Sequence, residues 1–363
     1  MNGPGNVPGN GPVGGPAPER VPERAPGWVP APGPHGGDAP AVARALGLDP
    51  AQVLDLSASV NPFAPDPGPV VAAALRCGAL GRYPDDDDRR AATVALAGAL
   101  GVDERRLLLT NGGAEAIALV AAELGRGWVD RPDFSLYERH LAEVAPGAPR
   151  FRSDPHNPTG LLAPPGEEAA VWDEAFYPLA TGRWTAGRSG SVTIGSVTKV
   201  LACPGLRIGY VVVPEDDGAA LGVAGLRDRL EARQPRWAVG TAALVALPAL
   251  LDRADLGGWA AAVAEHRTRL CQLLAGHGLD PAPSDANFVL VRGAAELRER
   301  LARFGVVVRD CGTFGLEGSV RVAVPDGAGL ERLDRALDLA LPTAAAGALA
   351  SATAATSRGA VPR

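Results

Sequence analysis

The sequence predicts an α/β fold with a mostly parallel sheet in a large domain, followed by a smaller α+β domain. Two observations carry this prediction. Between residues 106 and 213, short and nearly continuous apolar stretches alternate with helical patterns, which is typical of a sheet covered by helices on both faces. After a mainly helical stretch from about 218 to 276, strands and helices alternate again to about residue 341. A chain of 363 residues is long enough to form both units.

The individual elements follow from the same patterns. Strands are expected at residues 106–110, 169–173, 191–195 and 207–213, and later at 287–291, 306–309 and 319–324. Helices are expected over Glu115–Leu124 and Tyr137–Val144, with a last helix ending near residue 341. We expect a disordered Pro/Gly-rich head (1–34), an arm reaching the small domain and substrate pocket (35–65), a large domain (66–235), a small domain (236–341) and a disordered tail (342–363).

Composition excludes several classes of protein. A net charge of −6 and a pI near 5.5 argue against a nucleic-acid surface. Four scattered cysteines without a C-x-x-C pair predict buried free thiols in a reducing compartment. No membrane-span or signal-peptide pattern is present, so we expect a soluble, cytoplasmic protein. The acidic run Asp85–Asp88 is interpreted as the start of a helix to about Leu100, and no metal is expected.

The chain contains a single lysine, Lys199, and 34 arginines. Arginine can supply any solvated positive charge, but only lysine offers an amine that loses its proton and becomes a nucleophile. Lys199 follows an apolar strand, and the hydroxyls of Ser196 and Thr198 lie in the same turn. We therefore predict a reactive amine here; the alternative is a chance survivor on a solvated loop.

Four other features can form a site with this lysine. Gly112–Gly113 join a strand to a helix, where backbone amides bind phosphate, although a simple tight turn has the same composition. Asn157 in N-P-T-G is a possible amide donor or an ordinary turn residue. Asp173 ends an apolar strand and either caps the following turn or pairs with a cationic ring nitrogen. Arg207 favours a neutral Lys199 amine or holds a phosphate.

This combination of a phosphate cradle, an amide, a carboxylate and one activated lysine suggests pyridoxal 5'-phosphate as the cofactor. The motifs N-P-T-G, D-E-A-F and S-V-T-K with P-G-L-R-I-G-Y resemble those of the class I and II aminotransferases of fold type I, over roughly residues 35–341. The resemblance implies a fold-type I large domain with a seven-stranded type of sheet. It implies that Lys199 is the catalytic lysine that carries the cofactor, that Asp173 partners the ring nitrogen, and that Asn157 donates to the ring oxygen.

The resemblance also assigns residues around the cofactor. Those implied to hold its phosphate are Gly113, Ala114, Ser196 and Arg207. Phe134 is implied to stack on the ring, the alternative being core packing. Tyr83 is implied to reach the cofactor phosphate of a neighbouring subunit, which makes the protein a homodimer. Arg321 is implied to clamp the substrate carboxylate, the alternative being a surface arginine on an edge strand.

The N-terminal part narrows the expected reaction. P-H-G-G-D at 34–38 and L-D-L-S-A-S-V-N-P-F-A-P at 54–65 resemble the opening of threonine-phosphate decarboxylases of cobalamin biosynthesis. His35, Ser57 and Asn61 are then candidates for binding a phosphorylated substrate; the alternative for His35 is a tail residue. The sequence thus predicts L-threonine-O-3-phosphate decarboxylase, which yields aminopropanol phosphate, with an aminotransferase of a phosphorylated amino acid such as histidinol phosphate as the alternative. Rival classes are a regulator that borrowed the fold and an enzyme without a cofactor.

Two departures from the family pattern affect these expectations. Phe176 stands where many aminotransferases have a tyrosine, and Tyr177 is expected to point elsewhere. Asp154 and His156 replace two asparagines of the usual N-P-N-N-P-T-G. Asn157 is intact, so these changes concern substrate contacts.

Overall fold

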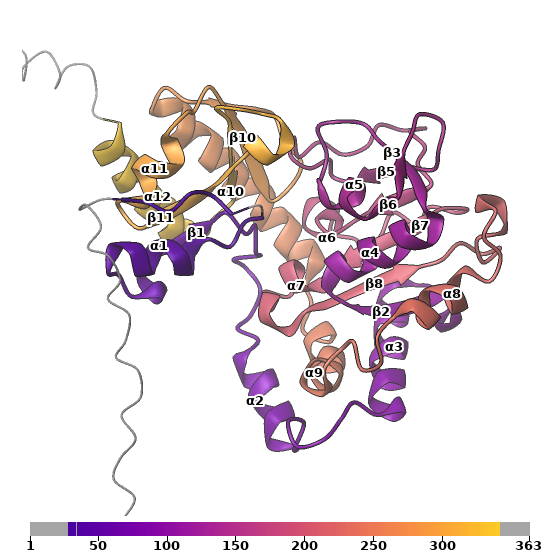
Figure 1. Ribbon diagram of the computed structural model, residues 1–363. Coiled ribbons are helices and arrows are strands. Elements are labelled where there is room, and N and C mark those ends of the chain that lie inside the picture. The colour runs from indigo at the N-terminus through magenta and orange to yellow at the C-terminus, as the bar shows by residue number, and fades with distance from the viewer. Residues whose placement is uncertain (1–27, 34, 342–363) are drawn as a thin grey trace, which may run out of the picture.

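The computed structural model describes residues 28–33 and 35–341, which form two sheets with their helices (Figure 1). The larger sheet has seven strands in the order β2-β8-β7-β6-β5-β3-β4. Their bounds are β2 Leu107–Asn111, β3 Arg126–Val129, β4 Glu143–Val144, β5 Arg150–Ser153, β6 Val171–Asp173, β7 Val192–Ser196 and β8 Ile208–Val212. Only β8 runs antiparallel to its neighbours, β2 and β7. The predicted α/β fold with a mostly parallel seven-stranded sheet is confirmed.

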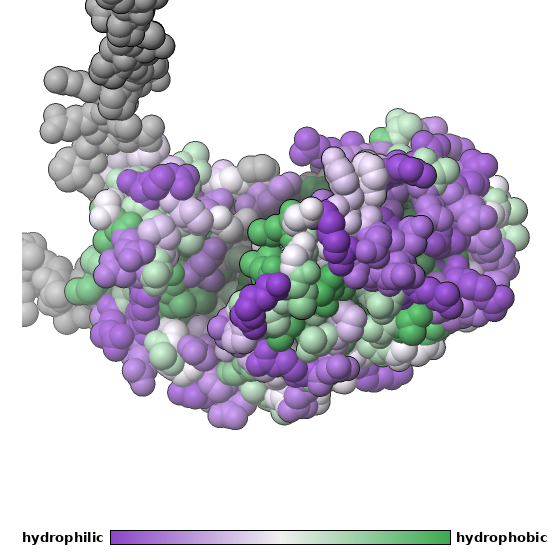
Figure 2. Space-filling model, turned by 90° about the horizontal axis from the view of Figure 1, so that it is seen from below, coloured by the Kyte–Doolittle hydropathy of each residue, from purple (hydrophilic) through white to green (hydrophobic). Residues whose placement is uncertain are grey.

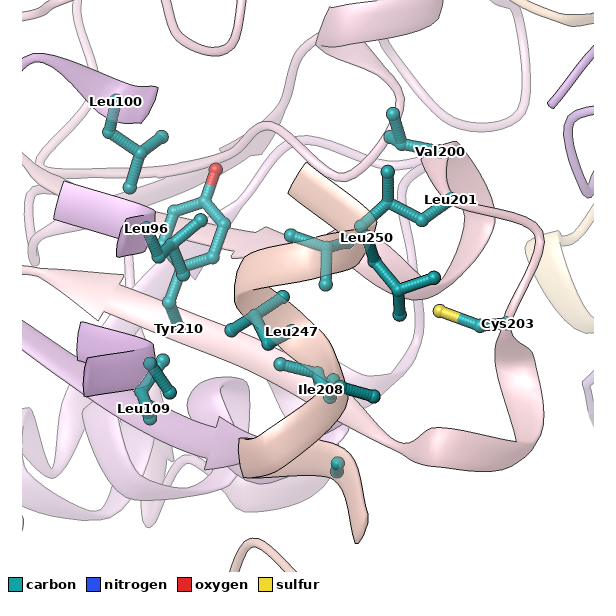
Figure 3. Packing of buried hydrophobic residues seen from close by; sticks show 14 of the residues in the cluster. Leu96, Leu100, Leu109, Val200, Leu201, Cys203, Ile208, Tyr210, Leu247 and Leu250 are labelled. Carbon is teal, nitrogen blue, oxygen red and sulfur yellow. The ribbon is translucent and has the colours of Figure 1, made fainter. Parts of the chain in front are cut away.

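Successive side chains of a strand point to opposite faces of the sheet, and those of the central strands are mostly apolar. Both faces of this sheet are therefore buried. Leu109 of β2 and Tyr210 of β8 face one apolar layer, which is formed by α2 (Gly68–Arg76), α3 (Asp86–Leu100) and α9 (Thr241–Leu251). Figure 3 shows both residues among Leu96 and Leu247 of that layer. Leu108 faces the opposite layer, which is formed by α4 (Gly112–Leu124), α5 (Leu136–His140) and α8 (Leu226–Arg233).

The smaller sheet has the order β1-β11-β12-β10-β9. Its strands are β1 Leu54–Leu56, β9 Asp280–Pro281, β10 Phe288–Arg292, β11 Val306–Asp310 and β12 Val320–Ala323, and its helices are α1 Ala39–Leu46, α11 Leu297–Ala302 and α12 Gly327–Ala340. Because β1 pairs in parallel with β11, the N-terminal arm lies beside the C-terminal part of the chain (Figure 1). The remaining elements are α6 Tyr177–Thr181, α7 Val197–Val200, α10 Leu256–Gly276 and the 3-10 turns Pro50–Gln52, Glu104–Arg106, Pro204–Leu206, Ala219–Leu221 and Gly312–Phe314.

The helix α10 connects the two cores. Trp259 in its first half packs with α9 in the core of the large sheet, whereas Leu270 and Leu274 pack in the core of the small sheet. We propose that the large unit extends into α10, further along the chain than the boundary expected at residue 235.

Some sequence expectations need correction. The helix expected over Tyr137–Val144 ends at His140, because the amides of Ala142 and Glu143 donate to the carbonyl of Gly125 and the chain enters β4. Cys77 is exposed and Cys271 half-buried, so only Cys203 and Cys311 are buried thiols. The helix α3 runs to Leu100 as predicted, and the Asp85 carboxylate caps it by accepting the Asp88 amide at 2.8 Å.

Part of the N-terminal head that was expected to be disordered, residues 28–33, is described by the structure. Arg298 donates to the carbonyl of Pro30 at 2.9 Å and Arg309 to that of Gly33 at 2.8 Å, so residues 28–33 are bound to the small unit. Residues 28–33 of the head that was expected to be disordered thus contact the small unit, and the rest of the head and tail expectations (1–27, 34 and 342–363) lie outside the described residues. Within the described ranges, no helix combines the length and apolar character needed to cross a membrane.

Candidate active site

Lys199 lies in α7, which begins directly after the carboxyl end of β7 in the large sheet. Its Nζ is 4.2 Å from the centre of the Phe176 ring. Asn61 holds the turn from the opposite side, since its backbone amide donates to the Lys199 carbonyl at 2.9 Å and its Nδ2 to the Val200 carbonyl at 2.9 Å. Asn61, expected at the substrate end, thus contacts the segment that carries the lysine.

The surroundings of Lys199 favour its neutral amine. Loss of hydration, followed by the charge of Arg321 and more weakly of Arg207, lowers the pKa of Lys199 to about 8, while Asp173 acts in the opposite direction. An amine with such a pKa is a nucleophile and a proton acceptor near neutral pH, which an ordinary surface lysine is not. The predicted reactive amine has the environment that it requires.

Asp173 is the last residue of β6, and its carboxylate accepts two hydrogen bonds. The Tyr137 hydroxyl donates to Oδ2 at 2.9 Å, and the Ala175 amide donates to Oδ1 at 3.0 Å. Burial raises the pKa of Asp173. A carboxylate held in this way suits a cationic partner such as a protonated ring nitrogen. Sequence reasoning missed Tyr137; its one signal was the F-S-L-Y spacing, which places it one helical turn after Phe134.

Asn157 and Arg321 are in direct contact. Arg321 Nη1 donates to Asn157 Oδ1, so Nδ2 is the donor that Asn157 can offer to a ligand. The Arg321 guanidinium lies 4.4 Å from the centre of the Phe288 ring, and burial lowers the pKa of Arg321 to about 10. Its Nε is buried and has no hydrogen-bond partner within the described part of the chain. The alternative of a surface arginine on an edge strand is wrong, because β12 lies between β11 and β10.

Glycines allow close contacts with the backbone and with Arg207 where α4 begins. Gly112 has a φ of +71°, and a side chain there would overlap the Arg207 guanidinium. Gly209 is also required, because its Cβ would overlap the backbone of Gly112. A Cβ on Gly113 would lie 3.5 Å from the Cβ of Ser196, whose hydroxyl is 2.9 Å from that of Thr198.

The start of α4 therefore brings together the amides of its first turn, the Ser196 hydroxyl and the Arg207 guanidinium. Ala114, which is exposed, is the next residue of that turn. This donor set fits a phosphate dianion. Together with Lys199, Asp173 and Asn157, it fits pyridoxal phosphate.

The N-terminal arm brings His35 to Phe134. The two ring centroids are 5.6 Å apart in an edge-on arrangement. His35 Nδ1 is buried without a hydrogen-bond partner among the described residues, and burial, then Arg309 and Arg139, lower the pKa of His35. Ser57 fixes the arm, since its hydroxyl donates to Asp55 Oδ1 at 2.6 Å and accepts the Gly37 amide at 2.8 Å. His35 is thus not a loose tail residue.

Tyr83 lies on the surface with 73% of its area exposed. Its ring stacks on that of Trp237, with centroids 4.5 Å apart and planes inclined by 27°. Tyr83 is thus packed against Trp237 and presented outward, whereas the other predicted residues gather around Lys199 or on the arm.

The fold and this site fit the class of enzymes that use a phosphorylated aldehyde cofactor. The chain matches the aminotransferase class I and II family over residues 151–338. It is 31% identical to threonine-phosphate decarboxylase from Salmonella typhimurium, covering 84% of this chain and 95% of that protein. It is 29% identical to histidinol-phosphate aminotransferase from Moorella thermoacetica, covering 78% and 83%.

A solved structure supports the same fold. Histidinol-phosphate aminotransferase from Sinorhizobium meliloti, in complex with pyridoxal-5'-phosphate, superposes with a TM-score of 0.68 at 19% identity, covering 84% of this chain and 95% of that one. The chain belongs to the class I and II aminotransferase family. As a member of this family, it is a pyridoxal-phosphate-dependent enzyme.

Proposed function

We propose that the enzyme acts on a small amino compound that carries a phosphate, and that it binds this phosphate near His35. The observation that carries the proposal is the corner where the arm meets Phe134, in which the positive charges of Arg309 and Arg139 act on the half-buried His35 ring. Arg309 Nη2 also donates to Thr313 Oγ1 at 2.9 Å, which fixes the guanidinium beside the arm. An anion in this corner would find an imidazole nitrogen that lacks a partner in the described structure.

Each residue of the site would have a distinct role in the reaction. The cofactor, when bound, withdraws electrons from the bonds of the substrate α-carbon. Lys199 would carry the cofactor and then, as a neutral amine, accept or return a proton at that carbon. Asp173 would hold a proton on the ring nitrogen, and Asn157 Nδ2 would donate to the ring oxygen. The buried Arg321 guanidinium would bind the carboxylate of a substrate that has one, such as O-phospho-L-threonine or 2-oxoglutarate, its unpartnered Nε being a spare donor.

Transamination is our first candidate for the reaction. Most of the similar curated relatives are histidinol-phosphate aminotransferases, which favours the alternative of the sequence analysis over its first expectation. Decarboxylation is the second candidate, because the P-H-G-G-D segment places His35 on Phe134 and the decarboxylase relative is 31% identical. In that reaction the carboxylate rather than the hydrogen would leave the α-carbon.

Two measurements test the proposal. Borohydride reduction of the protein mixed with pyridoxal phosphate should label a single internal peptide, because Lys199 is the one lysine of the chain; an unlabelled peptide would exclude the cofactor site. The loaded enzyme is then given histidinol phosphate with 2-oxoglutarate, or O-phospho-L-threonine alone. Glutamate formation indicates transamination, and carbon dioxide release without a keto acid indicates decarboxylation. If neither substrate reacts, the proposed substrate class is wrong.

We also propose a homodimer in which Tyr83 serves the neighbouring site. The proposal is supported by the exposed side chains of Tyr83 and Trp237, which precede α3 and α9 in the chain. The face seen in Figure 2 has apolar patches among hydrophilic side chains. Sedimentation should give twice the mass of one chain. Mixing the inactive variants Lys199→Ala and Tyr83→Ala should restore part of the activity, because each mixed dimer then has one intact shared site; no recovery would contradict shared sites.

A further inference from the structure

Asp133 is a buried carboxylate that the mechanism above does not use. It precedes Phe134 in the loop between β3 and α5, and it is 7% exposed. Its Oδ1 accepts the Phe134 amide at 2.7 Å and the Ser153 hydroxyl at 2.5 Å. Its Oδ2 accepts the Ser153 amide at 3.1 Å. One carboxylate thus joins the Phe134 loop to the end of β5.

Ser153 extends this connection to the active-site amide. Its hydroxyl accepts the backbone amide of Asn157 at 2.8 Å, while its own proton is donated to Asp133. The path from Phe134 through Asp133 and Ser153 to Asn157 consists of hydrogen bonds between buried or half-buried groups, which are expensive to leave unmade. Both ends of the path are residues assigned to the cofactor ring.

We propose that Asp133 is a positioning residue that sets Phe134 and Asn157 relative to each other, and hence the ring-binding geometry of the site. The inference rests on the proposed cofactor roles of those two residues. A neutral amide at position 133 cannot replace the carboxylate, because its NH₂ group would face the Ser153 N–H donor. A side chain with two acceptor oxygens is required, and aspartate supplies them from the residue next to Phe134.

The test compares Asp133→Asn with a matched control, Glu123→Gln. Glu123 is also a buried carboxylate that bridges two partners, Arg229 and Arg233, but it lies near the C-terminal end of α4. Both variants are expected to melt at lower temperature than the wild type. Only Asp133→Asn is expected to weaken pyridoxal phosphate binding, by about tenfold, as is typical when a partner that orients a ligand-binding group is lost. It should also shift the absorption maximum of the bound cofactor, since the ring's neighbours move.

Ser153→Ala provides a second route to the same answer, because it removes the hydroxyl between Asp133 and Asn157. It should weaken binding as well, and the double variant should be no weaker than the worse single variant. Wild-type affinity and absorption in a folded Asp133→Asn variant, or equal losses in Glu123→Gln, would overturn the inference. If the wild type itself does not bind pyridoxal phosphate, the proposed cofactor roles fail first, and the two failures are distinguished.

Discussion

The Tyr137 hydroxyl donates a hydrogen bond of 2.9 Å to the carboxylate of Asp173. The two residues come from different elements, the start of α5 and the end of β6. Tyr137 is 1% exposed, and its ring packs against Phe134 and Phe151 with centroid distances of 5.9 Å each. Its hydroxyl therefore has little freedom, and Asp173 is held by a rigid donor that has a pKa raised well above the usual value by burial. Asp173 is thus positioned before any ligand binds.

Tyr137→Phe should weaken cofactor binding. The variant removes one of the two hydrogen bonds donated to the half-buried Asp173 carboxylate, which should cost about 1–3 kcal/mol of binding free energy. It should also raise the pKa of Asp173 further, because the Tyr137 hydrogen bond lowers it against the effect of burial. Titration of the apoprotein with pyridoxal phosphate measures the change in Kd. Tyr177→Phe, on the half-buried tyrosine that begins α6, is the control; equal Kd values for both variants would contradict the role of Tyr137.

The reactivity of the single lysine should depend on pH near 8. The pKa of Lys199 is lowered to about 8, chiefly by loss of hydration, so its neutral fraction rises as the pH passes that value. The rate at which an amine-specific reagent labels the Lys199 peptide of the apoprotein should have its midpoint there instead of above 10. Arg321→Met should move the midpoint upward by removing the second largest cause. A wild-type midpoint near 10.5 would show that the amine is not activated.

For the residues in two of the short motifs, the sequence was sufficient to predict that they lie close together. Lys199 follows β7 and Asp173 ends β6, two neighbouring parallel strands, and the carboxyl ends of parallel strands meet at one edge of the sheet. Their spacing along the chain therefore predicts their proximity. The strands β3 and β5 were harder to predict, because R-G-W-V and R-F-R-S lack a continuous apolar run.

The partners of these residues could not be predicted in the same way. Tyr137 meets Asp173 across 36 positions, and Arg321 meets Asn157 across 164. Contacts at such distances depend on how loops cross the edge of a sheet, which no local pattern records. The short helix α5 was predicted to be too long for a similar reason, because its end is set by the distant carbonyl of Gly125.

Arg188 should be essential for stability, because it bridges the ends of two neighbouring strands. Its guanidinium pairs with Asp154 beyond β5 and, at 2.6 Å, with Glu174 beyond β6, and both carboxylates are buried. The acidic residue that replaces the family's asparagine at 154 thus has a cationic partner. Arg188→Met leaves two buried charges unpaired and should cost about 3–5 kcal/mol of unfolding free energy in urea. Arg105→Met, in an exposed pair with Asp103, is the control and should leave the urea midpoint unchanged.

Asp133 should make the stability of the apoprotein fall as the pH rises toward neutrality. Burial raises the pKa of Asp133 from 3.8 to about 6, against the hydrogen bonds from Ser153 and Phe134. Between these values the native state keeps a proton that the unfolded chain has released, so the stabilisation is complete below about pH 4 and is lost as the pH passes 6.

This pKa shift corresponds to about 3 kcal/mol of unfolding free energy. Asp173, Tyr137 and His156 also face Asp133, but they are common to the wild type and to Asp133→Asn. The unfolding free energy of the variant should therefore decline less between pH 4 and 7 than that of the wild type, as measured by urea unfolding at each pH. Parallel curves would show that the Asp133 carboxyl does not titrate in this range, although its hydrogen bonds could still position Phe134 and Asn157.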